Sequence, residues 1–417
     1  MKRYDELYLK RSVESLKGIS TSEILGFIKP KIETALTWEE LEEKLNRGKT
    51  LNIKLGIDPT GAELHFGHLV PVMLLDLFLR AEHHIDLVIG DFTARVGDPS
   101  GRETARVPLT IEQILNNFSS YKKQISPYID TSAITLRRNS EWLEKMNLSD
   151  FFSIIQNINL GDATQREDFR ARAKNAEGVS LAEACYGVLM GIDSLNLETD
   201  IELGGLDQLL NFNQCRKVLE ISSKEKEVAL TTPILEGTAG DGRKMSKSFG
   251  NYVALDATNE DKFGKIMSIP DNLMFSYFAS FAPVMEKESD ELKAFIEENP
   301  LEAKKQLATF IVALGSKELS QGEAEREKFE RKFSKKEITE DDVIEIIGGG
   351  DETHFEVLSM SEYFESKSEL RRLFEQGAVV HIKPSGEDMV LDLDTVVSEA
   401  EGIVRVGKRR FFKISIK

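Results

Sequence analysis

Two histidines near a predicted helix start could bind a phosphate group. His65 and His68, with Gly67 directly before the second, follow a run over 51–57 whose alternating apolar residues predict a strand. The apolar run 69–79 after them predicts a buried helix, whose first amides are unpaired and carry the positive end of the helix dipole. This junction favours an anion. Two alternatives stay open from these residues alone: a metal site, for which further ligands are not evident, and a structural pair at a buried helix start.

A second group of residues could supply positive charge from a loop. Lys244 and Lys247 are interleaved with Ser246 and Ser248, after a glycine-rich stretch at 237–242. Alone, two lysines among serines are typical of a solvated loop. On a loop that can close, however, their ammonium groups could reach the same anion as the histidines.

Taken together, the HxGH pattern and the later KMSKS pattern resemble the two signatures of class I aminoacyl-tRNA synthetases. Further stretches are similar to bacterial tyrosyl-tRNA synthetases, namely 54–60, 89–93, 97–102 and 202–208. The resemblance covers nearly the whole chain, and the two signatures in this order are highly specific. It implies an enzyme that activates tyrosine with ATP to tyrosyl-adenylate and transfers the tyrosyl group to tRNA(Tyr).

The composition fits an ordinary globular protein of two or three domains. The 417 residues are 41% hydrophobic and 30% charged, and they contain no apolar run that predicts a signal peptide or a membrane span. Two cysteines are too few for a disulfide framework and fit a cytoplasmic protein. The formal net charge of -17 speaks against a nucleic-acid partner only at face value, because a local basic patch is sufficient for phosphate binding. The segment 401–417, with six basic residues and Glu401 as its one acidic residue, offers such a patch.

The remaining pattern predicts an α/β fold. Short strand-like runs separated by helical patterns indicate βαβ units and a mostly parallel sheet, at 51–57, 85–90, 133–137, 200–203 and 227–231. A ligand would then lie across the carboxyl ends of the strands. Strand patterns vanish from about 257 to 345, where amphipathic helices are expected, and Gly348–Gly350 is predicted to be a hinge or linker.

By resemblance, three domains follow. They are a Rossmann-like parallel-sheet catalytic domain at 1–256, a helical anticodon-side domain at 257–347 and a small α+β S4-like RNA-binding domain at 350–417. The S4-like features lie at 366–379 and 406–411. The RNA-binding residues implied are Arg371, Arg372, Lys408, Arg409 and Arg410, although an ordinary exposed helix face would also explain the first two.

The resemblance also implies roles in the ATP site. The implied catalytic residues are His65, His68, Lys244 and Lys247. The implied ATP-binding residues are Thr60, Gly67, Asp207, Ser246 and Lys247. Mg²⁺ would accompany ATP, and no dedicated protein metal site is predicted. Preorganised donors of this sort contribute about 3–4 kcal/mol each in comparable oxyanion sites.

The implied amino-acid pocket departs from the family pattern. Its expected residues are Lys54, Gly56, Asp98, Tyr186, Met190, Asp193 and Gln208. In the family, the tyrosine at 186 and a glutamine at 190 hold the substrate ammonium, and the aspartate at 193 binds the phenol. Here Met190 replaces that glutamine, Ile192 a tyrosine and Leu206 a serine or threonine, whereas lysine at 54 is usual in one bacterial branch. The lost glutamine removes one acceptor, a change of roughly 1–3 kcal/mol if nothing compensates.

Several functions remain open at this point. The kept Asp193 favours a phenolic substrate, because an unpaired buried carboxylate is costly. The chain is thus either a divergent housekeeping tyrosyl enzyme or a paralogue for a different or modified amino acid. A catalytically silent RNA-binding relative would not need the intact histidines and lysines, and the basic C-terminal segment counts against a tRNA-independent adenylating ligase. The family resemblance further implies tRNA and tyrosine as partners, a homodimer and a cytoplasmic location.

Overall fold

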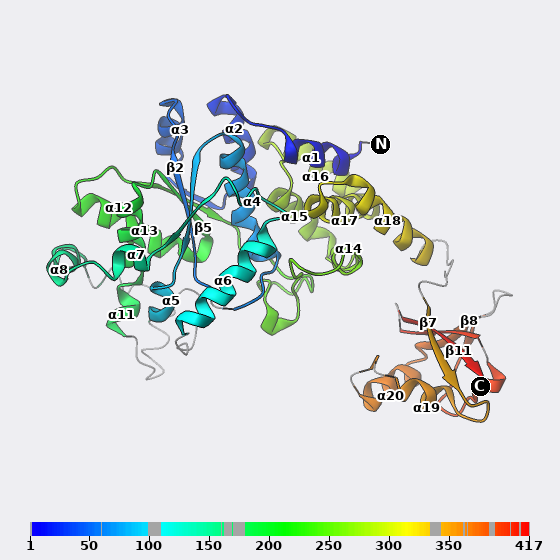
Figure 1. Ribbon diagram of the computed structural model, residues 1–417. Helices are drawn as coiled ribbons and strands as arrows, with labels where there is room; N and C mark the ends of the chain where they lie inside the picture. Colours follow the sequence, from blue (N-terminus) through cyan, green and yellow to red (C-terminus); the bar gives the residue numbers. More distant parts are fainter. Residues whose placement is uncertain are drawn as a thin grey trace. The chain divides into compact units, whose positions relative to one another are not determined.

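The chain forms two compact units, Met1–Arg326 and Glu327–Lys417, each built on its own sheet (Figure 1). This computed structural model describes residues 2–59, 61–98, 110–159, 161, 169, 180–333, 343–361, 363–364, 366–382, 388–400, 402–407 and 410–416. Among these residues, no helix combines the length and the apolar character needed to cross a membrane.

The sheet of the first unit confirms the predicted α/β fold. Its strand order is β1-β6-β5-β2-β3-β4, and all neighbours are parallel except β1 and β6. The strands are β1 Thr34–Leu36, β2 Asn52–Ile57, β3 His84–Ile89, β4 Thr135–Arg138, β5 Ile201–Gly205 and β6 Val228–Thr232. The five predicted strands are all present. The short antiparallel β1 was not predicted, because three half-buried residues carry too little alternation to be recognised.

Helices cover both faces of this sheet. Figure 1 shows α4 (Phe66–Arg80) on one side of β2 and β5, with α12 (Tyr186–Leu197) and α13 (Leu209–Ile221) on the other. The predicted buried helix is thus confirmed as α4, but it begins earlier than expected, so Pro71 lies in its second turn. Between β3 and α12 the described helices are α5 Thr93–Val96, α6 Ile111–Ile125, α7 Ser140–Leu143, α8 Leu148–Ile155 and α11 Leu181–Ala184.

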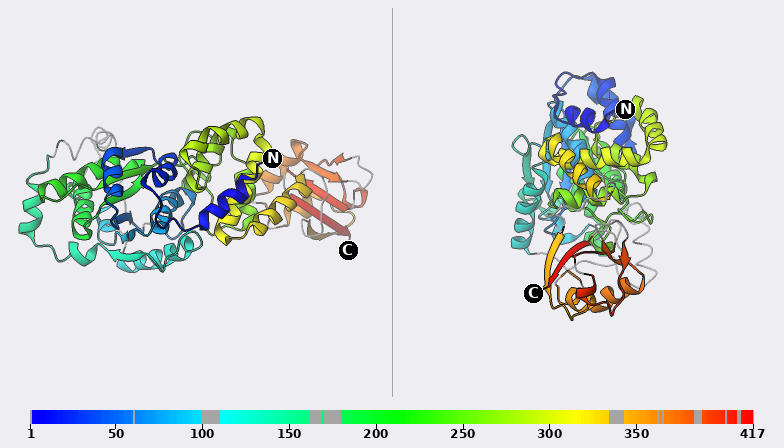
Figure 2. Two further views of the ribbon diagram at one scale, coloured as in Figure 1. Left: turned by 90° about the horizontal axis from the view of Figure 1, so that it is seen from above. Right: turned by 90° about the vertical axis from the view of Figure 1, so that its right-hand side faces the viewer.

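The remaining helices of the first unit join the two ends of its sequence. The N-terminal helices are α1 Tyr4–Val13, α2 Thr21–Ile28 and α3 Trp38–Asn46, and the later ones are α14 Asn259–Met267, α15 Met274–Phe281, α16 Ser289–Glu298, α17 Pro300–Ser316 and α18 Leu319–Phe333. Figures 1 and 2 show α1 lying beside α17, and α15 packs against α4. These helices therefore brace the element that carries the two histidines.

A buried lysine fastens α15 to the N-terminal segment. The Lys31 ammonium donates to the carbonyl oxygens of Ala279, Ser280 and Ala282 at 2.8, 3.2 and 2.7 Å. Replacing Lys31 by methionine leaves these carbonyls without that donor, so we expect the free energy of unfolding to fall by about 2–4 kcal/mol. Urea denaturation measures this change. The matched variant Lys29→Met, which removes a half-exposed ion pair, should cost about 1 kcal/mol or less; equal losses would contradict the account.

The second unit corrects the predicted linker. Its strand order is β7-β11-β10-β8-β9, with β7 Val343–Gly348, β8 Val379–Ile382, β9 Met389–Val390, β10 Gly402–Val406 and β11 Arg410–Ile416. Helices α19 His354–Ser359 and α20 Lys367–Glu375 complete it. Gly348 ends β7, and a Cβ there would lie 2.7 Å from Val357. Gly348 therefore serves close packing, and the glycine run lies inside this unit and not between the two units, so the hinge prediction was wrong.

Candidate active site

One cavity collects most of the residues singled out in the sequence. It has a volume of about 470 Å³ and opens at the carboxyl ends of β2, β5 and β6, beside the start of α4. The expected site residues that line it are Gly56, His65, Gly67, His68, Asp98, Tyr186, Met190, Asp193, Asp207, Gln208, Lys244 and Ser246. Thr60 lies outside the described residues. This is the edge at which an open α/β sheet binds its ligands.

The two histidines are held as neutral hydrogen-bond donors. His65 caps α4: its Nδ1 accepts from the Gly67 amide at 3.2 Å, and Nδ1 of His68 accepts from the His65 amide at 3.2 Å. Enclosure by the protein lowers the pKa of His65 to about 3 and that of His68 to about 4. With Nδ1 accepting, the proton of each neutral ring is on Nε2. Each ring can therefore donate from Nε2 to a ligand.

The lysine loop is tied to the histidine segment through the backbone. The amide of Phe66 donates to the Val253 carbonyl, and the Leu255 amide to the Leu64 carbonyl, both at 3.0 Å. This pairing places the segment after the lysines directly against the start of α4. The two signatures, far apart in sequence, are thus parts of one local structure.

Asn251 holds the lysine loop in shape. Its side chain accepts from the Ser246 amide at 2.9 Å and donates to the Lys244 carbonyl at 3.2 Å. Lys244 and Ser246 line the cavity, whereas the Lys247 ammonium lies 3.0 Å from a carboxylate oxygen of Glu63. Lys247 would have to leave Glu63 to reach a ligand in the cavity.

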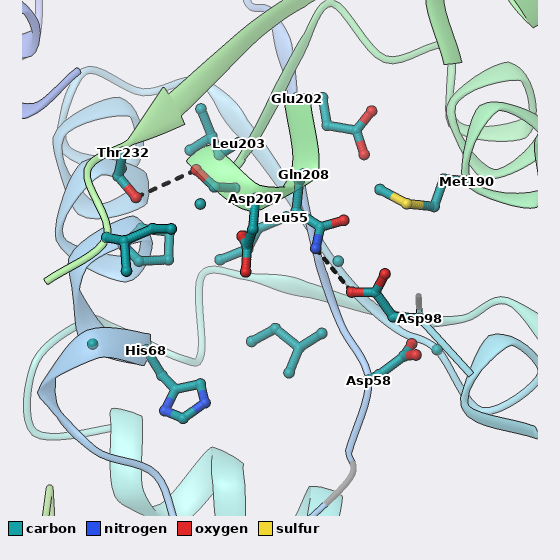
Figure 3. A pocket seen from close by; sticks show the side chains of 18 of the residues that line it. Leu55, Asp58, His68, Asp98, Met190, Glu202, Leu203, Asp207, Gln208 and Thr232 are labelled. Carbon is teal, nitrogen blue, oxygen red and sulfur yellow. Dashed lines mark hydrogen bonds between the residues drawn. The ribbon is translucent and has the colours of Figure 1, made fainter. Parts of the chain in front are cut away.

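A polar cluster at the rim of the cavity offers acceptors for a cation. The Tyr186 hydroxyl donates to Asp58 at 2.9 Å, and Thr93 donates to the other oxygen of Asp58 at 2.8 Å. Figure 3 shows Gln208 and Asp98 pointing toward one another, with a hydrogen bond of 2.8 Å. Asp58 was not predicted as a site residue, although it lies in the stretch 54–60 that carries the resemblance.

Asp193 is buried in the cavity wall with two donors on it. Trp142 Nε1 donates to one oxygen at 2.7 Å, and Asn139 Nδ2 donates to the other at 3.3 Å. Burial raises the pKa of Asp193 to about 7, against the opposing effects of Lys54, Trp142 and Asn139. Neither donor was singled out in the sequence, because each reaches Asp193 only through tertiary packing.

This raised pKa predicts a pH dependence of substrate recognition. Lowering the pH through about 7 protonates Asp193 and removes the charged acceptor that a substrate hydroxyl would need, so kcat/KM for a hydroxyl-bearing substrate should fall up to about tenfold between pH 8 and pH 6. The histidines are neutral over this range and add nothing to the profile. The profile should become flat in Asp193→Asn; an unchanged slope in that variant would assign the titration to another group.

Lys54, expected in the amino-acid pocket, is not among the residues that line the cavity. Its ammonium lies 2.8 Å from Glu202 and donates to Ser194 Oγ at 2.6 Å and to the Met190 carbonyl at 3.0 Å. Glu202 is the member of this pair that lines the cavity. The sequence could have indicated this ion pair, because each of two strands that are otherwise largely apolar contains one charged residue, and the two charges are of opposite sign.

The expected RNA-binding residues lie in the second unit. Arg371 and Arg372 are exposed on α20, and the Arg371 guanidinium lies 5.4 Å from the Phe355 ring centre. Arg410 donates to the Tyr363 carbonyl at 2.8 Å and lies 5.1 Å from the Phe364 ring centre. Lys408 and Arg409 lie outside the described residues.

This combination of a parallel sheet, a histidine-capped helix and a lysine loop at its carboxyl edge defines a class I aminoacyl-tRNA synthetase. A model of the class I tRNA synthetases for tryptophan and tyrosine matches residues 46–329. The chain belongs to this family.

Relatives of known name narrow the comparison to tyrosine enzymes. The chain is 37% identical to a tyrosine–tRNA ligase of Carboxydothermus hydrogenoformans, over 97% of this chain and 98% of that protein. It is 36% identical to a tyrosine–tRNA ligase of Thermotoga maritima, over 95% of this chain and 98% of that protein.

Solved structures show the same fold. The tyrosyl-tRNA synthetase of Archaeoglobus fulgidus in complex with L-tyrosine matches with a TM-score of 0.60 and 23% identity, covering 74% of this chain and all of that one (100%). A truncated mitochondrial tyrosyl-tRNA synthetase of Coccidioides posadasii matches with a TM-score of 0.59 and 22% identity, covering 78% of this chain and 95% of that one.

Proposed function

We propose that the protein is a tyrosine–tRNA ligase, which forms tyrosyl-adenylate from tyrosine and ATP and transfers the tyrosyl group to tRNA(Tyr). One observation carries the proposal: the two histidines, Lys244 and the kept Tyr186 and Asp193 line a single cavity. The cavity thus offers donors for phosphates and acceptors for an amino acid in one space.

In the first step, the tyrosine carboxylate attacks the α-phosphorus of ATP and pyrophosphate leaves. His65 and His68 donate from Nε2 to phosphate oxygens, and Lys244 adds positive charge from the loop. Lys247 joins them once it has left Glu63, as the nucleotide's charge competes for its ammonium. No side chain becomes covalently bound, since the site works by positioning and charge stabilisation.

The amino acid is held at its two ends. Its ammonium group meets Asp98 and the pair of Tyr186 with Asp58, its carboxylate lies by Gln208, and its hydroxyl donates to Asp193. Asp58 lies close enough to Tyr186 to make up for the acceptor lost where Met190 replaces a glutamine. The phosphate end of the site carries imidazole and ammonium groups, which can donate to phosphate oxygens. None of them is an oxygen ligand of the kind that Mg²⁺ prefers, so Mg²⁺ would enter with ATP.

Tyrosine-dependent exchange of pyrophosphate into ATP tests this function. Among the standard amino acids, tyrosine alone should support exchange, and Asp58→Asn should weaken tyrosine binding more than it slows adenylate formation. Exchange with another amino acid, or with a modified tyrosine only, would favour the paralogue. Absence of exchange with any of them would favour a silent RNA-binding relative.

We also propose that residues 1–256 carry out the chemistry, that the helices of residues 257–347 face the anticodon side, and that residues 350–417 are an S4-like RNA-binding module. The double variant Arg371→Ala/Arg372→Ala should lower tRNA affinity about tenfold and flatten its salt dependence, because two phosphate contacts are lost. Filter binding at several salt concentrations measures this. Lys217→Ala, an exposed lysine of the first unit, serves as control, and equal effects of both changes would remove the arginines from the RNA site.

Two further properties complete the proposal. The exposed apolar side chains of Leu148 and Phe152 lie one turn apart on α8 and suit a homodimer contact; light scattering should return twice the 46.9 kDa chain mass, and a monomer mass would contradict this.

The enzyme would act in the cytoplasm, where Cys185 and Cys215 remain free thiols. Loss of activity upon placement in a reducing buffer would argue against that location.

A further inference from the structure

Three ionisable side chains, from β2, from β5 and from the residue directly before β6, meet beside the amino-acid pocket. Lys54 on β2 lies opposite Glu202 on β5, and Glu227 stands two residues before Ala229, the β6 partner of Glu202. Since side chains alternate along a strand, all three point to the face covered by α12 and α13. Their exposed fractions are 2%, 1% and 0%. The cluster is therefore fully buried.

The ammonium of Lys54 is held within this cluster. It donates to Ser194 Oγ and to the Met190 carbonyl, and it forms an ion pair with Glu202 at 2.8 Å. Despite burial, the negative charge of Glu202 and Glu227 keeps the pKa of Lys54 above its ordinary value. Lys54 thus stays charged and fixes the carboxylate of Glu202 in place.

Glu227 is the neutral member. Its carboxyl group is fully buried and lies close to Glu202 and Ser194. Burial first, and then the charge of Glu202, raises the pKa of Glu227 well above its usual range. The raised pKa favours the protonated form of Glu227, and the Lys54 ammonium, 2.8 Å from Glu202, pairs with the carboxylate of that residue.

A metal ion is the other way to occupy this cluster. One oxygen each of Glu202 and Glu227 and the Cys215 sulfur lie within 4.8 Å of one another. The Lys54 ammonium already lies 2.8 Å from Glu202, however, and supplies the positive charge that an ion would bring. The cluster is therefore complete without a metal.

The side chain of Glu202 lines the cavity, and so does a second carboxylate, that of Asp193. Met190 lines the cavity as well, and Figure 3 shows the Glu202 carboxylate on the same side of the pocket as the Met190 side chain. Asp193 has its own donors, Trp142 and Asn139. A tyrosine ring brings one hydroxyl, which can satisfy one of the two carboxylates. The other can accept a second donor from the ring.

We propose that Glu202, held by Lys54, is a second specificity-determining carboxylate of the amino-acid pocket, and that the pocket takes tyrosine-type rings with a further hydrogen-bond donor beside the hydroxyl. This inference rests on the proposed tyrosine activation. A ring substituent of similar size without a donor gains nothing from Glu202 and meets its negative charge. Glu227 does not line the cavity, and in its protonated form it adds no second negative charge beside Glu202.

Pyrophosphate exchange with a matched pair of substrates tests the inference. The full-length protein should use 3,4-dihydroxyphenylalanine at least about tenfold better than 3-chlorotyrosine in kcat/KM, because only the former donates to a carboxylate. In Glu202→Gln, Lys54 takes the amide oxygen and the amide N–H groups face the ring, so the ratio should fall to about threefold or less. Glu227→Gln exchanges a neutral acid for a neutral amide outside the cavity lining and should keep the wild-type ratio.

The outcomes separate this inference from the function on which it rests. Absence of tyrosine-dependent exchange in the wild type would contradict the proposed function itself. Normal tyrosine exchange with a wild-type ratio near one, or with the same ratio in Glu202→Gln, would overturn only the role of Glu202. A wild-type ratio near one overturns the role of Glu202 even if Glu202→Gln does not fold.

Discussion

Replacing Asp193 by alanine should abolish most of the preference for tyrosine over phenylalanine. Tyrosyl-tRNA synthetases are themselves the known example of sites that bind a hydroxyl and reject the analogue without it, by about 10⁴-fold or more, so this magnitude belongs to the family. Without Asp193, the ratio of kcat/KM for the two amino acids should fall to about 10² or less, because the hydroxyl loses its charged acceptor. Pyrophosphate exchange with each amino acid measures the ratio.

A buried carboxylate elsewhere provides the control for this change. Asp86 on β3 is 3% exposed and lies near His84 and Arg137 at 3.3 and 3.5 Å. Asp86→Ala should lower stability while leaving the preference for tyrosine intact. An unchanged preference in Asp193→Ala would remove Asp193 from the substrate pocket.

Replacing His68 by alanine should slow tyrosyl-adenylate formation by about 10²–10³-fold, which is the usual effect of removing one preorganised donor from a site where charge develops. Tyrosine binding should change little, since the Nε2 donor faces the phosphates and not the amino acid. Single-turnover rates and equilibrium binding of tyrosine separate the two effects.

His83 offers a matched imidazole outside the site. Its Nδ1 accepts from the Leu51 amide at 3.2 Å, beyond the other end of α4. His83→Ala should therefore leave adenylate formation near the wild-type rate. If His68→Ala weakened tyrosine binding as much as it slowed the reaction, its assigned role at the phosphates would be wrong.

The sequence predicted the fold where burial leaves a periodic pattern. Strands β2, β3, β5 and β6 are buried on both faces and stand out as short apolar runs, and α4 is apolar nearly all round. The glycine run at 348–350 misled the prediction, because flexibility and close packing both require a residue without a side chain. The position of Val357, which packs against Gly348, shows that close packing and not flexibility is the reason for the glycine there.

The site could be predicted only as far as its residues stand in recognisable short patterns. The histidine pair, the lysine loop, Tyr186 and Asp193 belong to such patterns. Trp142 donates to Asp193 from a segment whose relation to the pocket depends on helix packing. Glu202 lies in the recognised stretch 202–208, but its side chain was not assigned to the pocket, because its pairing with Lys54 depends on the register of the sheet. The same holds for the ion pair of Lys247 with Glu63, which no spacing in the sequence indicates.

The most direct test of the central claim is a single-turnover experiment with labelled tyrosine, ATP and the full-length protein, followed by addition of tRNA. We predict about one tyrosyl-adenylate per active site and rapid movement of the label to the 3′ end of a tRNA with a tyrosine anticodon, but not to a tRNA with a different anticodon. Absence of the adenylate, or an adenylate whose label never reaches tRNA(Tyr), would contradict the assignment as a tyrosine–tRNA ligase.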